Sequence, residues 1–321
     1  MEETPDNKCV SFNINVTVVG SCNTDLISYV PRLPKQGETI QGSRFSLGFG
    51  GKGANQCVMA ARLGAKAAMV AKLGADSFGE NFIKNFKDNG INTEFVTVTD
   101  KSTTGVAPIC VEEGGQNSIV IVPGANLLLS EEDVYNAKSL IKSSKVVICQ
   151  LEINPQTTLA ALKLAKNFGV LTIFNPAPGL ANLDREFYTY SDIICPNETE
   201  AEILTGLPVK SIVEAKMAAQ MLLKQGCGKV IITLGEQGSV IATTDTSEVI
   251  HVPAQKVKVV DTTGAGDAFI GSLAFYLAEH PRLGLEESVR RATILAGISV
   301  QSPGTQTSMP WATDLDPQIF S

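Results

Sequence analysis

The sequence is poor in the residues that several kinds of site need. Among its 321 residues are two histidines, His251 and His280, so a histidine-rich zinc centre or a Ser/His/Asp set is not expected. Lysine and arginine number 26 against 33 aspartates and glutamates, giving a net charge of −7, which excludes a broad basic surface for nucleic acid. An anionic ligand remains open, because helix N-termini bind phosphate through backbone N–H groups.

The sequence also lacks signs of secretion or membrane insertion. No apolar run approaches the roughly 20 residues that a membrane span needs, and the N-terminus is polar and acidic, so we expect no membrane partner and no signal peptide. The cysteines are odd in number, and none form a CxxC pair, which predicts buried thiols in a reducing compartment. The prediction is a cytoplasmic protein, with nuclear entry left open. The seven are Cys9, Cys22, Cys57, Cys110, Cys149, Cys195 and Cys227.

Hydrophobic residues make up 44% of the chain and charged residues 18%, enough for a sizeable core. Short β-branched runs alternate with amphipathic patterns of helical length. The runs span 14–19, 68–73, 146–150, 170–174, 192–195 and 230–234, and the helical patterns span 54–63, 77–89, 130–142, 155–168, 197–205 and 211–225. This alternation predicts an α/β fold, a mostly parallel sheet with helices on both faces and ligands at the carboxyl ends of its strands.

Two segments, about 28–50 and 103–122, break the alternation with short strand-like pieces separated by Gly and Pro. The pieces at 38–41, 105–111 and 117–122 are too β-like for plain loops. They predict a small antiparallel sheet that projects as a lid, with two unrelated hairpins as the alternative. Residues 1–13 are predicted to be a disordered tail, and residues 14–321 a single domain that includes this lid.

The first glycine cluster spans 48–56 and contains a G-x-G-x-x-G match. A dinucleotide site would place this match directly after the first strand, but it begins 28 residues after Gly20. A GxxxxGK[ST] phosphate loop is excluded because Gly53 follows Lys52. What remains is a turn that opens a helix and exposes Lys52 and Asn55, either as a ligand loop or as an ordinary helix start.

The second cluster, 261–269, follows a strand-like run at 257–260 and opens an apolar helix that continues through Leu277. Its small residues at 264–266 leave N–H groups bare at a helix N-terminus, an arrangement that stabilises charge in phosphoryl transfer. Asp267 stands where a carboxylate can take a proton from a hydroxyl. A carboxylate that merely complements the helix dipole is the simpler alternative, which the preceding small residues disfavour.

Polar residues also follow the ends of other predicted strands. Asn23 and Asp25 come after the first strand and can bind sugar hydroxyls or form an Asx turn. Glu152 follows the strand at 146–150 and is either a site carboxylate or a solvated loop acid. Both alternatives stay open for each of these residues.

Two further segments have a purely structural alternative. Asn197 and Glu200 fit a capping box, with the asparagine as N-cap and the glutamate three residues into the helix. The segment 233–238, Thr-Leu-Gly-Glu-Gln-Gly, can contact a nucleotide or form a hairpin turn.

Taken together, Gly50-Gly-Lys-Gly-Ala-Asn-Gln56 and Asp261-Thr-Thr-Gly-Ala-Gly-Asp267 resemble the phosphofructokinase-B family of carbohydrate kinases, over about residues 16–308. The resemblance implies a doubly wound α/β domain with a β-sheet lid, and a homodimer in which two lids clasp. It also implies transfer of a phosphoryl group from ATP to O5 of ribose, with Mg²⁺ and K⁺.

The resemblance implies roles by position. Asp267 would be the base, and Gly264, Ala265 and Gly266 the anion hole. The sugar would contact Asn23, Thr24, Asp25, Gly51, Lys52, Gly53, Ala54, Asn55, Glu152 and Asp267. ATP would contact Asn197, Thr233, Leu234, Gly235, Glu236, Gln237, Gly238, Gly266, Asp267 and Thr293. Glu200 would hold hydrated Mg²⁺, and K⁺ would lie among Asp261, Thr263, Ser299, Ser302, Gly304 and Ser308.

Other functions stay open at this point. A kinase could act on another pentose, on deoxyribose or on a nucleoside. An oxidoreductase could use the glycines at 48–53. A non-catalytic sugar-binding regulator is a third class, but the retained Asp267 and the intact run 264–266 argue against it.

Overall fold

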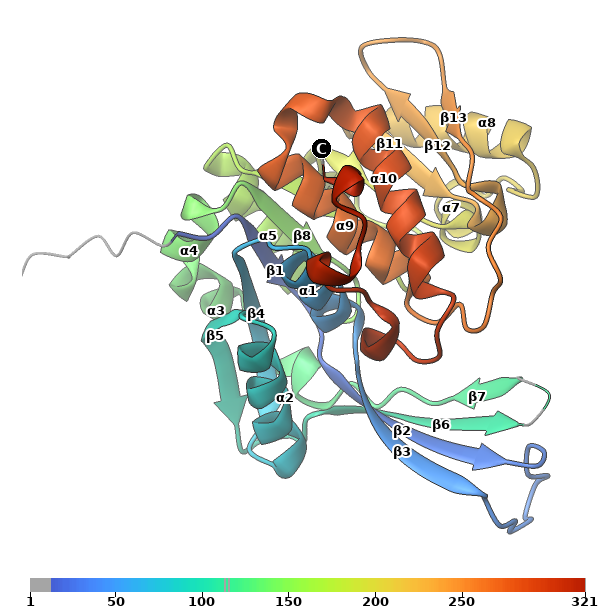
Figure 1. Ribbon diagram of the computed structural model, residues 1–321. Helices are drawn as coiled ribbons and strands as arrows, with labels where there is room; N and C mark the ends of the chain where they lie inside the picture. The colour runs from blue at the N-terminus through green and yellow to red at the C-terminus, as the bar shows by residue number, and fades with distance from the viewer. Residues whose placement is uncertain (1–12, 113, 115, 321) are drawn as a thin grey trace, which may run out of the picture.

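The computed structural model describes residues 13–112, 114 and 116–320 (Figure 1). Most of the predicted tail (residues 1–12) and Cys9 therefore lie outside the described residues. The chain forms a nine-stranded sheet, ordered β13-β12-β11-β10-β9-β8-β1-β4-β5, and a separate four-stranded sheet, ordered β3-β2-β6-β7. Within the described part of the chain, no helix is long and apolar enough to cross a membrane.

The large sheet consists of β1 Val16–Val19, β4 Ala67–Gly74, β5 Asn92–Thr99, β8 Val146–Cys149, β9 Leu171–Phe174, β10 Ile193–Ile194, β11 Lys229–Thr233, β12 Ser239–Thr243 and β13 Ile250–Val252. The seven neighbouring strands β11, β10, β9, β8, β1, β4 and β5 pair in parallel, whereas β12 and β13 add an antiparallel edge. From β1 the chain adds β4 and β5 on one side and β8 onward on the other. The predicted mostly parallel, doubly wound sheet is confirmed, and its switch point, between β1 and β8, is where such folds bind ligands.

Helices cover both faces of this sheet. The longer helices are α1 Lys52–Arg62, α2 Ser77–Asp88, α5 Pro155–Asn167, α8 Ile212–Leu223, α9 Ala265–Glu279 and α10 Gly284–Ser299, and the shorter ones α3 Glu131–Asn136, α4 Lys138–Ser143, α6 Arg185–Thr189 and α7 Glu198–Thr205. One face packs α1, α2, α9 and α10 around Met59, Phe82 and Leu273. The other packs α3, α4, α5 and α8 around Leu140 and Leu162. The central strands are buried on both faces because the side chains of each face pack against one of these two helical layers.

The small sheet, β2 Asn23–Val30, β3 Arg44–Gly50, β6 Gly105–Glu112 and β7 Asn117–Ile119, projects from the main body (Figure 1). The prediction of a separate small sheet is confirmed, but its purely antiparallel pairing is wrong, because β2 and β6 run parallel. The reason is topological: β2 follows β1 and β6 follows β5, and β1 and β5 point the same way.

Three local predictions were wrong. Residues 38–41 form no strand, because Glu38 accepts hydrogen bonds from Arg32 and from the Lys35 N–H and so closes a local turn. The helix predicted over 130–142 divides at Ala137 into α3 and α4. The run 257–260 forms no strand and lies outside both sheets, and the Val260 N–H donates a hydrogen bond to the Val300 carbonyl.

Candidate active site

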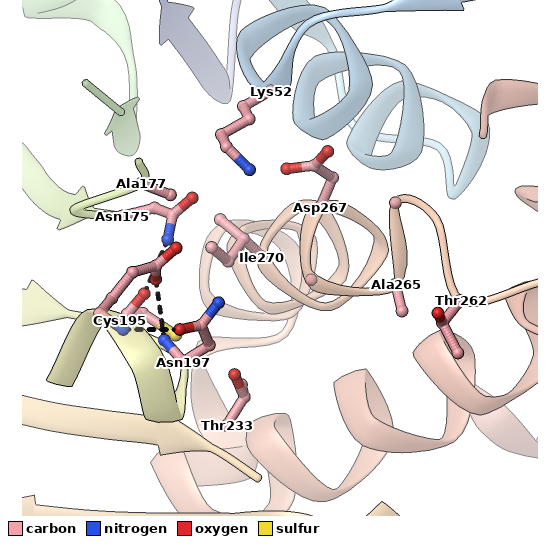
Figure 2. Close-up of a pocket in the computed structure, with 13 residues that line it drawn as sticks. Lys52, Asn175, Ala177, Cys195, Asn197, Thr233, Thr262, Ala265, Asp267 and Ile270 are labelled. Carbon is pink, nitrogen blue, oxygen red and sulfur yellow. Dashed lines mark hydrogen bonds between the residues drawn. The ribbon is translucent and has the colours of Figure 1, made fainter. Parts of the chain in front are cut away.

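A pocket of about 150 Å³ opens where the carboxyl ends of β9, β10 and β11 face the N-terminus of α9 (Figure 2). The start of α1 closes another side. The residues that line the pocket are Lys52, Asn175, Ala177, Cys195, Asn197, Glu200, Thr233, Thr262, Gly264, Ala265, Gly266, Asp267 and Ile270. Parts of both glycine clusters therefore meet at one site, together with residues from three strand ends.

The N-terminus of α9 forms one wall of this pocket. Gly264 is its N-cap, with a φ of 78° that favours glycine, and a Cβ there would lie 2.6 Å from Cγ2 of Thr305. Gly266 faces open space, since a Cβ built on it would meet no atom within 4 Å. The first N–H groups of a helix have no partner within the helix. This end of α9 is thus an accessible cluster of donors suited to a phosphate or a developing oxyanion.

Asp267, in the first turn of α9, is 7% exposed and held at both carboxylate oxygens. Nδ2 of Asn55 donates to its Oδ2 and Nε2 of Gln56 to its Oδ1, each over 2.9 Å. Gln56 is itself held by Nε2 of Gln150, over 2.6 Å to its Oε1. The carboxylate is fixed in place while it still borders the pocket.

Lys52 and Asp267 point toward one another across the pocket (Figure 2). Burial alone would lower the pKa of Lys52, but the nearby carboxylates Asp267, Glu152 and Glu200 outweigh it and raise that pKa. The amino group therefore stays protonated at neutral pH and carries a positive charge into the pocket.

Asn197 and Glu200 form the capping box that their spacing predicts. Oδ1 of Asn197 accepts from the Glu200 N–H over 2.8 Å, and Oε2 of Glu200 accepts from the Asn197 N–H over 2.9 Å. Both side chains also line the pocket, so a structural role does not exclude a binding role. Burial raises the pKa of Glu200, against the opposing effects of the Asn197 N–H and the Lys52 charge.

The segment 233–238 is a hairpin turn between β11 and β12. Thr233 lines the pocket, and the buried Leu234 donates its N–H to the Gly238 carbonyl over 2.7 Å. A Cβ on Gly238 would lie 2.0 Å from the Val252 carbonyl oxygen, so only glycine fits there. Thr293, on α10, lines a separate hollow of about 500 Å³ between β13 and α10.

The residues predicted to hold a sugar gather near the base of the lid. Oε2 of Glu152 accepts from Oγ of Ser21 over 2.6 Å and from the Lys52 N–H over 2.9 Å, which joins the end of β1 to the start of α1. Burial, reinforced by the charges of Glu152 and Asp267, raises the pKa of Asp25 to about 7. Oγ1 of Thr24 is buried and has no hydrogen-bond partner among the residues that the structure describes.

Asp261 ties together the two loops predicted to hold K⁺. Its Oδ1 accepts from the Thr263 N–H and its Oδ2 from the Gly304 N–H, each over 2.9 Å. The hydroxyls of Ser299 and Ser308 donate to nearby carbonyls, those of Ala296 and Thr305. The described residues contain no cluster of three or more His, Cys, Asp or Glu suited to a metal. Ser302 is exposed beside this loop.

Several residues that line the pocket, or that hold its side chains in place, were not predicted. The sequence did carry a signal for Asn175, since it directly follows a buried strand, and for Gln56, which closes the first glycine cluster. Asn126, which holds Oδ1 of Asn23 over 2.8 Å, lies in a 3-10 turn and had no such signal. Besides Asn175, the residues that line the pocket without having been predicted are Ala177, Cys195, Thr262 and Ile270.

Comparison with known proteins identifies the class. A family model described as pfkB family carbohydrate kinase matches residues 13–312. The chain belongs to this family, which confirms the resemblance seen in the two glycine clusters.

Particular relatives are similar over nearly their whole lengths. The chain is 56% identical to a mouse ribokinase over 95% of this chain and 94% of the relative. It is 42% identical to a deoxyribokinase of Salmonella typhi, over 92% and 96% respectively. A solved structure of Arabidopsis thaliana ribokinase complexed with ribose and ATP superposes with a TM-score of 0.85 at 32% identity, covering 94% of this chain and 97% of that one.

Proposed function

We propose that the protein transfers the γ-phosphoryl group of ATP to O5 of D-ribose, giving ribose 5-phosphate and ADP. The observation that carries this proposal is the placement of a fixed carboxylate, Asp267, beside the open N-terminus of α9 in a single pocket. The 56% identity to a mouse ribokinase and the superposition on a ribokinase complexed with ribose and ATP support ribose as the acceptor.

The residues divide the chemistry between them. Asp267 accepts the proton of the attacking hydroxyl, and its two amide partners keep it aimed at that hydroxyl. The N–H groups of Gly264, Ala265 and Gly266 stabilise the charge on the transferring phosphoryl oxygens. Since phosphoryl transfer needs mainly positioning and charge stabilisation, these groups suffice as the core of the site.

Lys52 contributes through charge. Its amino group faces the pocket shared with Asn197 and Thr233, so it contacts the phosphates while its backbone N–H fixes Glu152 for the sugar. Asn23, Asp25 and Glu152 bind the ribose hydroxyls, together with Thr24, the loop 51–55 and Asp267. Asn197 and the segment 233–238 bind ATP, with Thr293 on the adenine side.

The donor set suits two cations. Glu200 presents a carboxylate to the pocket, an oxygen ligand of the kind that hydrated Mg²⁺ takes, and Mg²⁺ supplies charge neutralisation on the phosphates. Asp261, Thr263, Ser299, Ser302, Gly304 and Ser308 offer only oxygen donors beside the start of α9, which fits K⁺. The protein's part is to hold these two loops together through Asp261.

Two lids would clasp in a homodimer. The small sheet exposes large apolar side chains, including Phe45, Leu47 and Ile119, each about half exposed. Covering them with a second copy would bury apolar surface and shield the sugar site from water. The cytoplasmic location inferred from the sequence stays a prediction.

Deoxyribose is the second candidate acceptor, because a deoxyribokinase is 42% identical over nearly its full length. A coupled ADP-release assay with ATP and Mg²⁺ separates the candidates when run over ribose, deoxyribose, fructose and adenosine, with and without K⁺. We expect the highest kcat/KM with ribose and an increase with K⁺. A higher kcat/KM with deoxyribose would make deoxyribose, instead of ribose, the substrate. No turnover with any acceptor would favour the sugar-binding regulator.

A further inference from the structure

A line of side-chain amides runs from the end of α1 to the carboxylate proposed as the catalytic base. Each link is a hydrogen bond between side chains that lie far apart in sequence or at helix ends. At the first end, Nε of Arg62 donates to Oδ1 of Asn89 over 2.8 Å, and Nδ2 of Asn89 donates to Oδ1 of Asn85 over 3.3 Å. Nδ2 of Asn85 then donates to Oε1 of Gln306 over 2.9 Å, and Nε2 of Gln306 donates to Oδ1 of Asn55 over 3.0 Å. At the other end, Nδ2 of Asn55 donates to Oδ2 of Asp267 over 2.9 Å. We call Asn89, Asn85, Gln306 and Asn55 the amide relay.

The direction of the relay is fixed at both ends. Arg62 can only donate, and an ionised Asp267 can only accept. An amide has one donating and one accepting end, so each member must turn its oxygen toward Arg62 and its nitrogen toward Asp267. Reversal of any member would set two oxygens or two NH₂ groups against each other. Three of its four members are shielded from water, since Asn55, Asn89 and Gln306 are each less than 9% exposed, which strengthens their hydrogen bonds, and Asn85 is partly buried.

Arg62 holds the relay in a second way. Its Nη1 donates to the carbonyls of Gln306 and of Met309, the latter over 2.9 Å. The guanidinium thus anchors both the first amide and the backbone of the loop that carries the third. Trp311 covers the guanidinium at 4.9 Å, which keeps it in place.

We propose that the amide relay is a positioning device: Gln306 and Asn85, which lie outside the pocket lining, set the orientation of the Asn55 amide so that it presents N–H, not oxygen, to Asp267. This rests on the proposed function, in which Asp267 is the base. Asn85 and Gln306 are positioning residues, because neither touches the pocket, and their effect reaches the reacting atoms only through Asn55.

The relay predicts different effects for two substitutions of Asn85. In Asn85→Asp the new carboxylate can only accept, so Gln306 is drawn to turn its NH₂ toward position 85 and its oxygen toward Asn55. Asn55 must then turn its own NH₂ away from Asp267 and face it with oxygen. Asn85→Ala removes the link without favouring reversal, because Asp267 still orients Asn55 and Gln306 from the other end.

The test compares the kcat of these two variants in the intact protein, with ribose and ATP. We expect Asn85→Asp to lower kcat by roughly tenfold or more, since small misplacements of catalytic groups have large effects, and Asn85→Ala to lower it less. KM for ATP should change little in either. The deficit of Asn85→Asp should shrink as the pH falls, because a protonated carboxyl at position 85 can donate to Gln306 again. A packing role predicts the opposite order, with the truncation to alanine more harmful than the near-isosteric aspartate, and that order would overturn the proposal.

A second pair guards against a folding defect from the added charge at the end of α2. Gln306→Glu should give the same reversal from the next link, whereas Gln306→Met, of similar shape, should give the smaller effect. Thermal unfolding checks that each variant is folded. The side-chain amide resonances of Asn55 in the sugar-free protein, assigned with Asn55→Ser, should move strongly in Asn85→Asp and little in Asn85→Ala. Equal movement of the Asn55 resonances in both variants would overturn the relay. This NMR test does not depend on activity, so a failure of the unmodified protein to phosphorylate ribose would count against the proposed function alone.

Discussion

Asn55 and Asp267 lie 212 residues apart in sequence, yet Nδ2 of Asn55 donates a 2.9 Å hydrogen bond to Oδ2 of Asp267. This contact joins the two glycine clusters, one at the start of α1 and the other at the start of α9. It turns two separate motifs into one site, in which a helix N-terminus and a carboxylate face the same pocket.

Asp267→Asn should lower kcat by at least roughly 10²-fold, because the amide cannot accept the proton that the attacking hydroxyl releases. Binding of ATP should remain mostly intact, since the N–H groups of α9 are unchanged. Single-turnover ADP release and a nucleotide titration measure the two effects separately. Turnover near that of the unmodified protein would remove Asp267 from the mechanism.

Asp25 should make ribose binding depend on pH near neutrality. Its pKa is raised to about 7, first by burial and then by the charges of Glu152 and Asp267, so the carboxylate that accepts ribose hydroxyls forms only as the pH rises through about 7. KM for ribose should therefore fall between pH 6 and 8. In Asp25→Asn, which does not titrate, KM should be higher and this part of the pH dependence lost. An unchanged profile in that variant would assign the titration to another group.

The same raised pKa has a consequence for stability. Between about pH 4 and 7 the folded protein keeps a proton on Asp25 that the unfolded chain has lost, so this group's contribution to the free energy of unfolding decreases as the pH rises through that window. Asp25→Asn should accordingly unfold at a higher temperature than the unmodified protein at pH 8, and the difference should narrow at pH 5. Thermal scans at the two pH values check this, and a variant less stable at pH 8 would contradict it.

Gly264 and Gly266 allow a matched comparison at the anion hole. Gly264→Ala should lower stability by about 1–3 kcal/mol, because φ is 78° and the new Cβ would press against Thr305, and should also lower kcat. Gly266→Ala meets no atom within 4 Å, so it should fold normally and lose kcat only, because its methyl group covers the N–H cluster. Normal kcat in folded Gly266→Ala would mean that the transferring phosphoryl group does not lie there.

Two substitutions of Asn197 can separate its role as a helix N-cap from its proposed role in nucleotide binding. Asn197→Ala should cost about 1 kcal/mol of stability through loss of the N-cap, whereas Asn197→Ser keeps a capping oxygen. KM for ATP should rise in both, because serine is too short to reach the nucleotide. If only the alanine variant shows a higher KM, Asn197 acts through the helix alone.

The sequence carried the local features of this fold and site, and missed those that depend on distant packing. Strand and helix patterns identified the parallel sheet, because burial on both faces leaves continuous apolar runs such as Val146–Cys149. The glycine clusters marked the turns that open α1 and α9. The relay through Asn85 and Gln306 was not predictable, because polar residues on a helix and in a loop have no pattern that distinguishes a hydrogen-bonded amide from a solvated one. The parallel pairing of β2 with β6 likewise follows from where β1 and β5 end, which local propensity does not encode.

The position of the transferred phosphate tests the central claim most directly. The purified protein would be incubated with ATP, Mg²⁺, K⁺ and D-ribose, and the product examined by proton-coupled ³¹P NMR. We predict a phosphomonoester signal split by the two C5 protons, formed in step with ADP and at least roughly 10²-fold more slowly with Asp267→Asn. A phosphate coupled to the single proton at C1, or ADP formed without any sugar phosphate, would contradict the account.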